Sequence, residues 1–209
     1  MKFYLVRHGE TEWNKLGRFQ GQYDTLLNDR GVSQAKLTAR SALDWNITAI
    51  YSSPLSRTMH VADEFANLLD LPVHPREGLM ELALGELEGV RGEEMRAGWP
   101  EVYETWNGHP ELTEMPGGES LKTLEERSWQ VILDLEKAHA PDDNMAIISH
   151  NFTIRAICGK LLGIPLCNFH RLHLALSSVS IFESVPRGRR LLSYNSTSHL
   201  EQELPAPSN

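Results

Sequence analysis

The sequence predicts an α/β fold, a three-layer α/β/α sandwich around a mostly parallel central sheet. Two observations predict it. Short apolar, β-prone runs recur along the chain, and segments with a helical spacing of apolar residues lie between most of them. Strands that alternate with helices in this way form a largely parallel sheet, with helices packed on its faces. The length of 209 residues suits one compact domain with a modest insertion.

The expected elements follow one another along the whole chain. The runs predicted as strands are residues 3–6, 47–52, 145–149, 178–182 and 191–194. The segments predicted as helices are residues 29–43, 57–69, 120–138 and 153–162. Pro54 cannot donate a ladder hydrogen bond and must follow the end of the second strand. Gly163 followed by Pro165 is typical of a helix end, so the last helix should stop there.

The segment 89–118 fits this alternation least well. It is rich in aromatic residues and proline and has no long helical period. We interpret it as an insertion at about 90–116, partly helical around 100–107, which covers one end of the sheet and contributes to specificity. In the alternative interpretation its tryptophans only pack against the domain. We therefore expect a single domain over residues 1–200, followed by a mobile tail, 201–209.

Charge, cysteine content and hydropathy disfavour several classes of protein. The formal net charge of −8 would repel a polyanion such as nucleic acid from most of the surface. Two cysteines, Cys158 and Cys167, cannot form a disulfide framework in a chain of this length and favour a reducing compartment. The N-terminal apolar run reaches Arg7 too soon for a signal peptide or a membrane span. We expect a cytoplasmic protein with no nucleic-acid or membrane partner, and we leave a homodimer open.

Three strand ends carry side chains that are suited to a phosphoryl group. Arg7 and His8 follow the first strand, Arg57 begins the helix after the second, and His150 follows the strand at 145–149. Ligands of open α/β sheets bind outside the carboxyl ends of the strands, so these side chains should meet there. Guanidinium groups match phosphate oxygens, and a neutral histidine can attack phosphorus. The residues therefore predict a pocket for a phosphoryl dianion around His8.

Further motifs extend this pattern over most of the chain. They are 7–11 (RHGET) with Trp13 and Asn14, 19–21 (FQG), 27–31, 52–58, Glu81 with Gly85, Glu88 and Gly89, 117–120 (GGES), and 149–150. In this order, over about residues 3 to 155, they resemble the histidine phosphatase superfamily, also called the phosphoglycerate-mutase-like family. No P-loop, Rossmann glycine fingerprint or Asp-rich metal motif is present in the sequence. We therefore expect catalysis without a metal or other cofactor.

The resemblance implies a role for each matching side chain. His8 would accept the phosphoryl group as a phosphohistidine. The residues that would bind the phosphoryl oxygens are Arg7, Arg57 and His150. Those that would lie around the phosphate or the substrate are Asn14, Gln20 and Gly21. Glu81 would protonate the leaving alkoxide, which is otherwise a poor leaving group; Glu86 and Glu88 are close in sequence and remain alternatives.

The sequence thus predicts a metal-independent phosphomonoester hydrolase, a histidine acid-type phosphatase, that acts on a small phosphorylated metabolite. Cofactor-dependent phosphoglycerate mutase is the first alternative. The acid is followed by 82–85 (LALG) rather than by the Arg-His-Tyr-Gly run of true mutases, which favours hydrolysis. Arg91 and Arg96 are the nearby cations that could replace that run, and we expect both to be solvated.

Phosphoserine phosphatase, as the specific activity, is a second possibility. The ending 195–200 looks like that of metal-independent phosphoserine phosphatases, whereas Leu84 stands where those enzymes tend to carry histidine. A binding module on an inactive phosphatase fold is disfavoured, because a pseudoenzyme usually loses one of the five residues proposed for catalysis. All five, Arg7, His8, Arg57, Glu81 and His150, are present.

Overall fold

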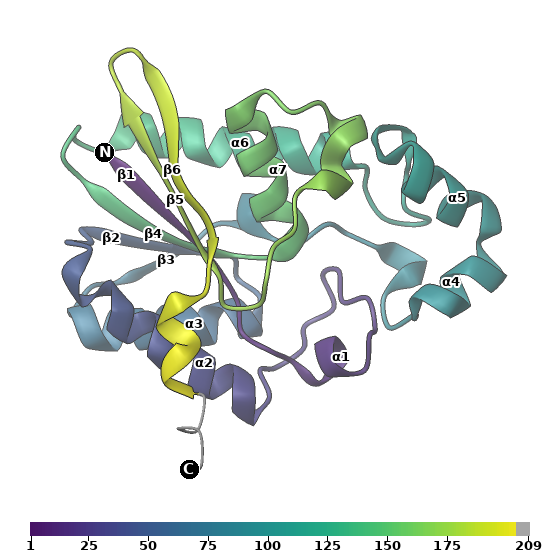
Figure 1. The fold of residues 1–209 in the computed structure, drawn as a ribbon, viewed down its shortest axis with the longest axis horizontal. Helices are drawn as coiled ribbons and strands as arrows, with labels where there is room; N and C mark the ends of the chain where they lie inside the picture. Colours follow the sequence, from purple (N-terminus) through teal and green to yellow (C-terminus); the bar gives the residue numbers. More distant parts are fainter. Residues whose placement is uncertain (204–209) are drawn as a thin grey trace, which may run out of the picture.

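A six-stranded sheet forms the centre of the fold, between two layers of helices (Figure 1). The computed structural model describes residues 1–203. In the order in which they lie side by side, the strands are β3 (Val73–Pro75), β2 (Ala49–Ser52), β4 (Asn144–Ser149), β1 (Lys2–Arg7), β5 (Val179–Val185) and β6 (Gly188–Ser196). The first four are parallel to one another, and β5 and β6 are antiparallel at one edge. The predicted α/β sandwich is confirmed.

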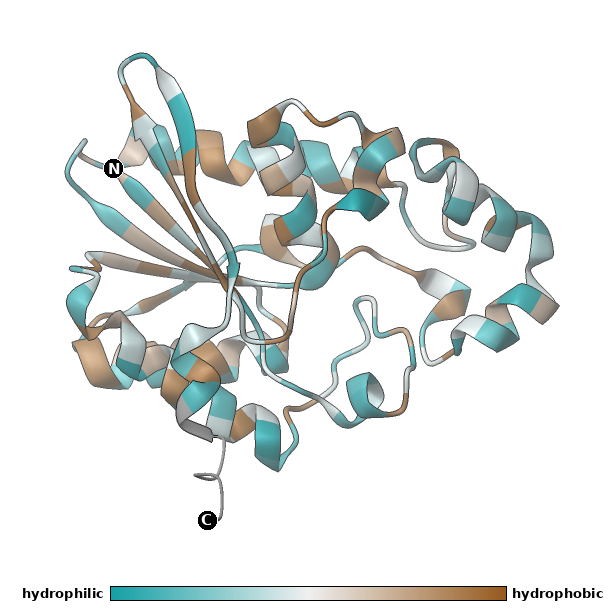
Figure 2. Cartoon of the chain, in the orientation of Figure 1, coloured by the Kyte–Doolittle hydropathy of each residue, from teal (hydrophilic) through white to brown (hydrophobic). Residues whose placement is uncertain are grey.

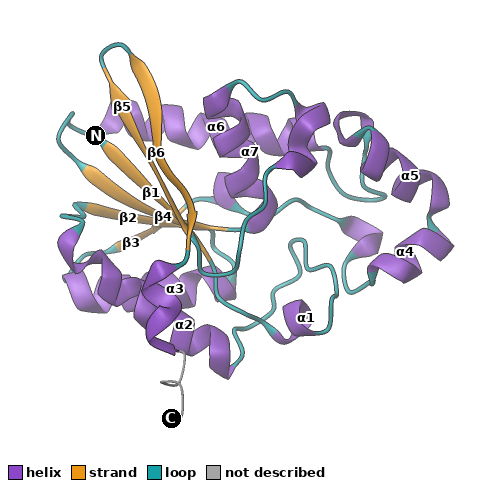
Figure 3. Ribbon diagram, in the orientation of Figure 1, coloured by secondary structure: helices purple, strands orange, loops and turns teal. Residues whose placement is uncertain are grey.

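Each face of the sheet has its own apolar core. Phe3 and Leu5 of β1 pack towards α6 (Leu121–Ala138) and α7 (Asn151–Leu162). Tyr4 and Val6 pack on the other face, towards α2 (Asp29–Ser41) and α3 (Ser56–Leu69). Because both faces of the central strands are covered, their sequences are continuous apolar runs rather than alternating ones. Figure 2 shows these runs in brown along the strands, and Figure 3 shows the helices on either side.

The four predicted helices are present, with ends that differ by one or two residues. α2 continues into the 3-10 turn η1 (Ala42–Asp44), and α7 begins two residues earlier than predicted. Ser120 caps α6 by accepting a hydrogen bond from the N–H of Thr123. α7 ends at Gly163, whose φ of 66° is left-handed, as the glycine-proline signal predicts.

Other differences lie in the strands and in short elements: β5 runs to Val185 rather than to residue 182, and β6 spans Gly188–Ser196 rather than 191–194. The strand predicted at 47–52 begins only at Ala49, three residues after Asn46, whose φ of 52° is left-handed. β3 and the one-turn helix α1 (Glu12–Lys15) have no counterpart in the prediction, since three or four residues are too few to reveal a period. Thr11 holds α1 through a reciprocal pair of hydrogen bonds with Asn14.

The inserted segment forms α4 (Gly92–Gly98), α5 (Pro100–Gly108) and the turn η4 (Pro110–Leu112), beyond the carboxyl ends of the parallel strands (Figure 1). The helix expected at 100–107 is α5, whereas α4 was not predicted. The inserted segment packs on a third apolar cluster. The buried members of this cluster include Leu82, Leu87, Met95, Met115 and Leu124. Of the tail expected to be mobile, residues 201–203 belong to the 3-10 helix η6 (Ser198–Glu203), and 204–209 lie outside the described residues. Over residues 1–203 every helix is too short or too polar to cross a membrane.

Candidate active site

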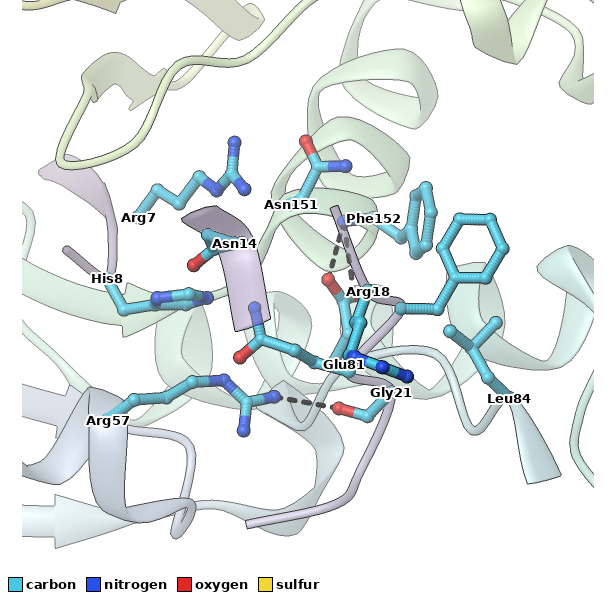
Figure 4. Close-up of a pocket in the computed structure, with 12 residues that line it drawn as sticks. Arg7, His8, Asn14, Arg18, Gly21, Arg57, Glu81, Leu84, Asn151 and Phe152 are labelled. Atoms are coloured by element: carbon cyan, nitrogen blue, oxygen red, sulfur yellow. Dashed lines mark hydrogen bonds between the residues drawn. The ribbon is translucent and has the colours of Figure 1, made fainter. Parts of the chain in front are cut away.

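A cavity of about 110 Å³ opens at the carboxyl ends of the parallel strands (Figure 4). The residues that line it are Arg7, His8, Asn14, Arg18, Phe19, Gln20, Gly21, Arg57, Glu81, Leu84, Asn151 and Phe152. Every site residue predicted from the sequence except His150 is among them. The ring of His150 lies beside that of His8, with 5.2 Å between the ring centroids. The fold therefore brings all the predicted residues to one place.

Strand register explains this convergence. Arg7 at the end of β1 pairs with Ser149 at the end of β4, and Ser52 at the end of β2 pairs with Ile148. The register continues one residue further, because the N–H of His8 donates to the carbonyl of Ser149 over 3.1 Å. Parallel strands that end at the same level must release their following residues side by side.

His8 presents an unprotonated nitrogen. Its Nδ1 lies 2.7 Å from the carbonyl oxygen of Gly9, which can only accept, so Nδ1 carries the proton and Nε2 keeps its lone pair. Burial, and then the positive charges of Arg57 and Arg7, hold the pKa of His8 well below its ordinary value. The imidazole is therefore neutral at physiological pH. Gly9 allows this loop to sit tightly, since a Cβ there would lie 2.6 Å from the carbonyl oxygen of Gly31.

Three buried nitrogens around His8 have no hydrogen-bond partner among the described residues: Nε of Arg7, Nε of Arg57 and Nδ1 of His150. Each of these side chains makes at least one other hydrogen bond, and Nη1 of Arg7 donates to the carbonyl of Leu174 over 2.5 Å. Arg57 donates from Nη2 to the carbonyl of Gly21 over 2.7 Å, and Nε2 of His150 lies 2.7 Å from the Ser53 hydroxyl. If that hydroxyl donates to Nε2, Nδ1 of His150 is left as a donor. Buried donors without partners are rare and costly, so this arrangement favours an anion with several acceptor oxygens.

The charges of the pocket agree with that interpretation. Burial lowers the pKa of Arg7 and of Arg57 to about 10, so both remain cations at neutral pH. Burial, followed by the charge of Arg57, holds the pKa of His150 well below its ordinary value. Although the chain has a net charge of −8, positive side chains outnumber negative ones in the lining of this pocket. Electrostatic attraction of an anion is local here rather than a property of the whole surface.

Glu81 is the one acidic residue that lines the pocket within the described chain. Its carboxylate accepts hydrogen bonds at 3.0 to 3.2 Å from the N–H groups of Leu82, Phe152 and Thr153 and from the Thr153 hydroxyl. The last two residues belong to the first turn of α7, which suits a carboxylate. The two neighbouring acids are engaged elsewhere and do not line the pocket. Glu86 accepts from the indole N–H of Trp99 and Glu88 from the N–H of Gln22.

The residues expected around the substrate also lie here. Oδ1 of Asn14 accepts from the N–H and the hydroxyl of Thr11, so its amide NH₂ remains available as a donor. Gln20 accepts from the Thr25 hydroxyl over 2.6 Å. Gly21 has a φ of 56°, and a Cβ there would lie 2.3 Å from Oε1 of Glu88. The backbone can therefore approach a bound group closely at this point.

The structure adds a cation that the sequence interpretation missed. Arg18 lines the pocket, and its Nη1 donates to the carbonyl of Gly89. Arg91 and Arg96, which we named as the nearby cations and expected to be solvated, do not line the pocket, whereas Arg18, which we did not name, does. The sequence feature that could have indicated Arg18 is its position directly before the 19–21 motif. Phe19, Leu84 and Phe152 form an apolar wall that continues into a smaller cavity. That cavity is also lined by Met95, Trp106 and Met115 of the insertion and by Leu87.

Comparison with known proteins identifies relatives over almost the whole chain. A family model described as the histidine phosphatase superfamily, branch 1, matches residues 3–197. Phosphoserine phosphatase 1 of Hydrogenobacter thermophilus is 35% identical over 200 residues, which cover 96% of this chain and 94% of that protein. A probable phosphoglycerate mutase GpmB of Salmonella choleraesuis is 33% identical over 188 residues, covering 86% and 83%.

Solved structures agree with these relatives. A phosphoserine phosphatase variant from Entamoeba histolytica, in complex with phosphoserine, superposes with a TM-score of 0.86 and 32% identity, over 95% of this chain and 98% of that one. Bacillus stearothermophilus YhfR reaches a TM-score of 0.90 at 24% identity, over 95% and 98%. At that identity the second similarity supports the fold alone.

Proposed function

This chain belongs to the histidine phosphatase superfamily, branch 1, and we propose that it hydrolyses small phosphomonoesters through a phosphohistidine formed on His8, without a metal. The chain is a phosphatase by its family and relatives. The proposal concerns which residues act and on what. We also propose a cytoplasmic enzyme, because Cys158 and Cys167 are both free thiols, which fits a reducing compartment.

One observation carries the mechanism: a neutral imidazole with a free lone pair lies beside three buried side-chain nitrogens that have no hydrogen-bond partner among the described residues. In the first step Nε2 of His8 attacks phosphorus and the bond to the ester oxygen breaks. Arg7, Arg57 and His150 donate to the phosphoryl oxygens, whose charge they stabilise in the transition state. Glu81 gives a proton to the departing oxygen, so the alcohol leaves neutral.

The second step restores the enzyme. A water molecule attacks phosphorus, the bond between phosphorus and Nε2 breaks, and free phosphate forms. Glu81, now a carboxylate, accepts the proton of that water and returns to its acid form. The N–H groups at the start of α7 stabilise Glu81 while it is ionised.

A turnover screen tests the proposal. Purified protein, in EDTA, is expected to release phosphate from p-nitrophenyl phosphate, phosphoserine and 3-phosphoglycerate. With 3-phosphoglycerate and a trace of 2,3-bisphosphoglycerate, little 2-phosphoglycerate should form, because a mutase must retain a bisphosphorylated intermediate. Loss of activity in EDTA that Mg²⁺ restores would overturn the metal-independent mechanism. Isomer formation far faster than phosphate release would instead establish a mutase.

Arg18 favours a substrate with a carboxylate on its alcohol portion, as in phosphoserine, the substrate in the name of the relative phosphoserine phosphatase 1. Arg18→Gln should raise KM for phosphoserine by about 10- to 100-fold, the usual effect of losing a hydrogen bond between charged groups. KM for phosphoethanolamine, which lacks the carboxylate, should change little. Arg96→Gln removes an exposed cation outside the pocket and serves as the control. Equal changes for both substrates would exclude Arg18 as the carboxylate site.

A further inference from the structure

Glu81 lies on a segment with little regular structure. Between β3 and the turn η3 (Gly85–Leu87), the chain forms only the 3-10 turn η2 (Glu77–Leu79). Neither a helix nor a strand therefore fixes the backbone of Glu81. Proton transfer nevertheless requires the carboxyl group to lie within hydrogen-bond reach of the departing oxygen. Something outside the segment must hold it in place.

Arg127 on α6 meets this requirement. Its guanidinium makes five hydrogen bonds, as many as the group has N–H donors. Nη1 donates to the carbonyls of Gly78 (2.9 Å) and Met80 (2.7 Å). Nη2 donates to the carbonyl of Glu81 itself over 2.8 Å. Nε and Nη2 donate to the two carboxylate oxygens of Glu119 at 3.0 and 2.5 Å.

Glu119 extends the same contact to the other side of Glu81. Its Oε1 accepts from the N–H of Ala83, and its own N–H donates to the carbonyl of Ala83, both over 2.9 Å. The Arg127 and Glu119 side chains are 22% and 13% exposed, so water competes little for the ion pair. Together the two residues fix the backbone on both sides of the proposed acid.

Two glycines let this segment pack closely against its surroundings. A Cβ on Gly78 would lie 2.5 Å from Cγ2 of Val131 on α6. A Cβ on Gly118 would lie 2.1 Å from the carbonyl oxygen of Ala83. The segment is therefore pressed against both α6 and the turn that carries Glu119.

The carboxylate of Glu81 is held from a second helix. The hydrogen bonds that it accepts from Phe152 and Thr153 come from the first turn of α7, which lies beside α6 (Figure 1). Lys160 of α7 and Glu125 of α6 join the two helices over 2.9 Å. The backbone of Glu81 is thus set by α6, and its carboxylate by α7.

We propose that Arg127 and Glu119 are positioning residues for Glu81, and that their hydrogen bonds set the efficiency of proton transfer to the leaving group. The inference rests on the proposed function, because it needs Glu81 to be the acid. Lysine at position 127 would keep the charge, but its single nitrogen cannot reproduce the fork that spans three carbonyls and a carboxylate. Fewer hydrogen bonds would then hold the backbone of the acid, although α7 would still hold its carboxylate, and small shifts of a catalytic group cost much rate.

Comparing two substrates with different leaving groups distinguishes a positioning role of Arg127 from a general loss of folded protein. Arg127→Lys should lower kcat/KM for phosphoserine by about tenfold or more, while kcat/KM for p-nitrophenyl phosphate falls less than about threefold. The reason is that p-nitrophenolate departs without a proton. Thermal unfolding checks that the variant is folded. Glu119→Gln, which keeps the size of the side chain but loses its charge, should shift the ratio in the same direction and carries the test if Arg127→Lys does not fold.

Arg189→Lys is the matched control. Arg189 also makes a two-pronged ion pair with a carboxylate, that of Glu136 on α6, and the pair is similarly buried at 29% and 14% exposed. It contacts neither Glu81 nor the pocket. This variant should leave the ratio of the two substrates unchanged. Equal losses on both substrates with Arg127→Lys would mean a merely structural role and would overturn the inference.

The Glu81→Gln background distinguishes the two possible failures. There, Arg127→Lys should no longer change the substrate ratio, because no acid remains to be positioned. If Glu81→Gln alone leaves the ratio unchanged, the proposed role of Glu81 fails. If Glu81→Gln changes the ratio but Arg127→Lys and Glu119→Gln do not, only the positioning inference fails.

Discussion

His8→Ala is expected to reduce turnover of every phosphomonoester by on the order of 10⁴-fold or more, because the covalent route is lost with its nucleophile. The wild-type enzyme, quenched with denaturant during turnover of a ³²P-labelled substrate, should carry label on the protein. A phosphorus–nitrogen bond is stable in alkali and breaks in acid, so the label should survive alkali only. His8→Ala should carry none.

His150→Gln is the matched control for this experiment. His150 is as deeply buried as His8, lies 5.2 Å from it between ring centroids, and its pKa is held low by the same kind of surroundings. Its removal takes away a donor to the phosphoryl oxygens but leaves the nucleophile. The variant should turn over slowly and still accumulate label. Label that persists in His8→Ala and disappears in His150→Gln would assign the nucleophile to His150 instead.

The residues proposed to bind the phosphoryl group could be predicted from short stretches of sequence. Arg7 and His8 directly follow a strand, and His150 follows another, so the parallel sheet brings them together at its carboxyl edge. Arg57 needs only one residue of helix to reach the same edge. Each of these placements depends on a few consecutive residues and on one rule of sheet topology. Among the strands and helices that carry these four residues, the prediction differs from the structure only at the ends of the elements.

The leaving-group end could not be predicted in the same way. Arg18 lines the pocket and donates a hydrogen bond to the carbonyl of Gly89. Arg127 donates to the carbonyl of Glu81, which lies more than forty residues earlier in the sequence. Hydrogen bonds from a side chain to the backbone of a distant segment leave no pattern of spacing or hydropathy in the sequence. The apolar wall likewise combines Phe19, Leu84 and Phe152 from three separate segments. The residues to which we attribute specificity are therefore those that sequence reasoning predicts least well.

If Glu81 is the general acid, Glu81→Gln should slow one kind of substrate more than the other. Glutamine keeps the shape of the side chain but cannot donate a proton as a carboxylic acid does. We expect kcat/KM for phosphoserine to fall by about 10²-fold or more, the usual contribution of general acid catalysis, and that for p-nitrophenyl phosphate to fall by less than about tenfold. The measurement is the ratio of the two values, in which errors of active enzyme concentration cancel.

Glu88→Gln provides the comparison, because Glu88 is close in sequence but accepts from the backbone of Gln22 and does not line the pocket. It should leave the ratio of the two substrates unaltered. Equal slowing of both substrates by Glu81→Gln would mean that Glu81 contributes only charge or structure. The proton would then have to come from Glu86 or Glu88, and since neither carboxylate lines the cavity, the loop that carries them would have to move for either to reach the leaving oxygen.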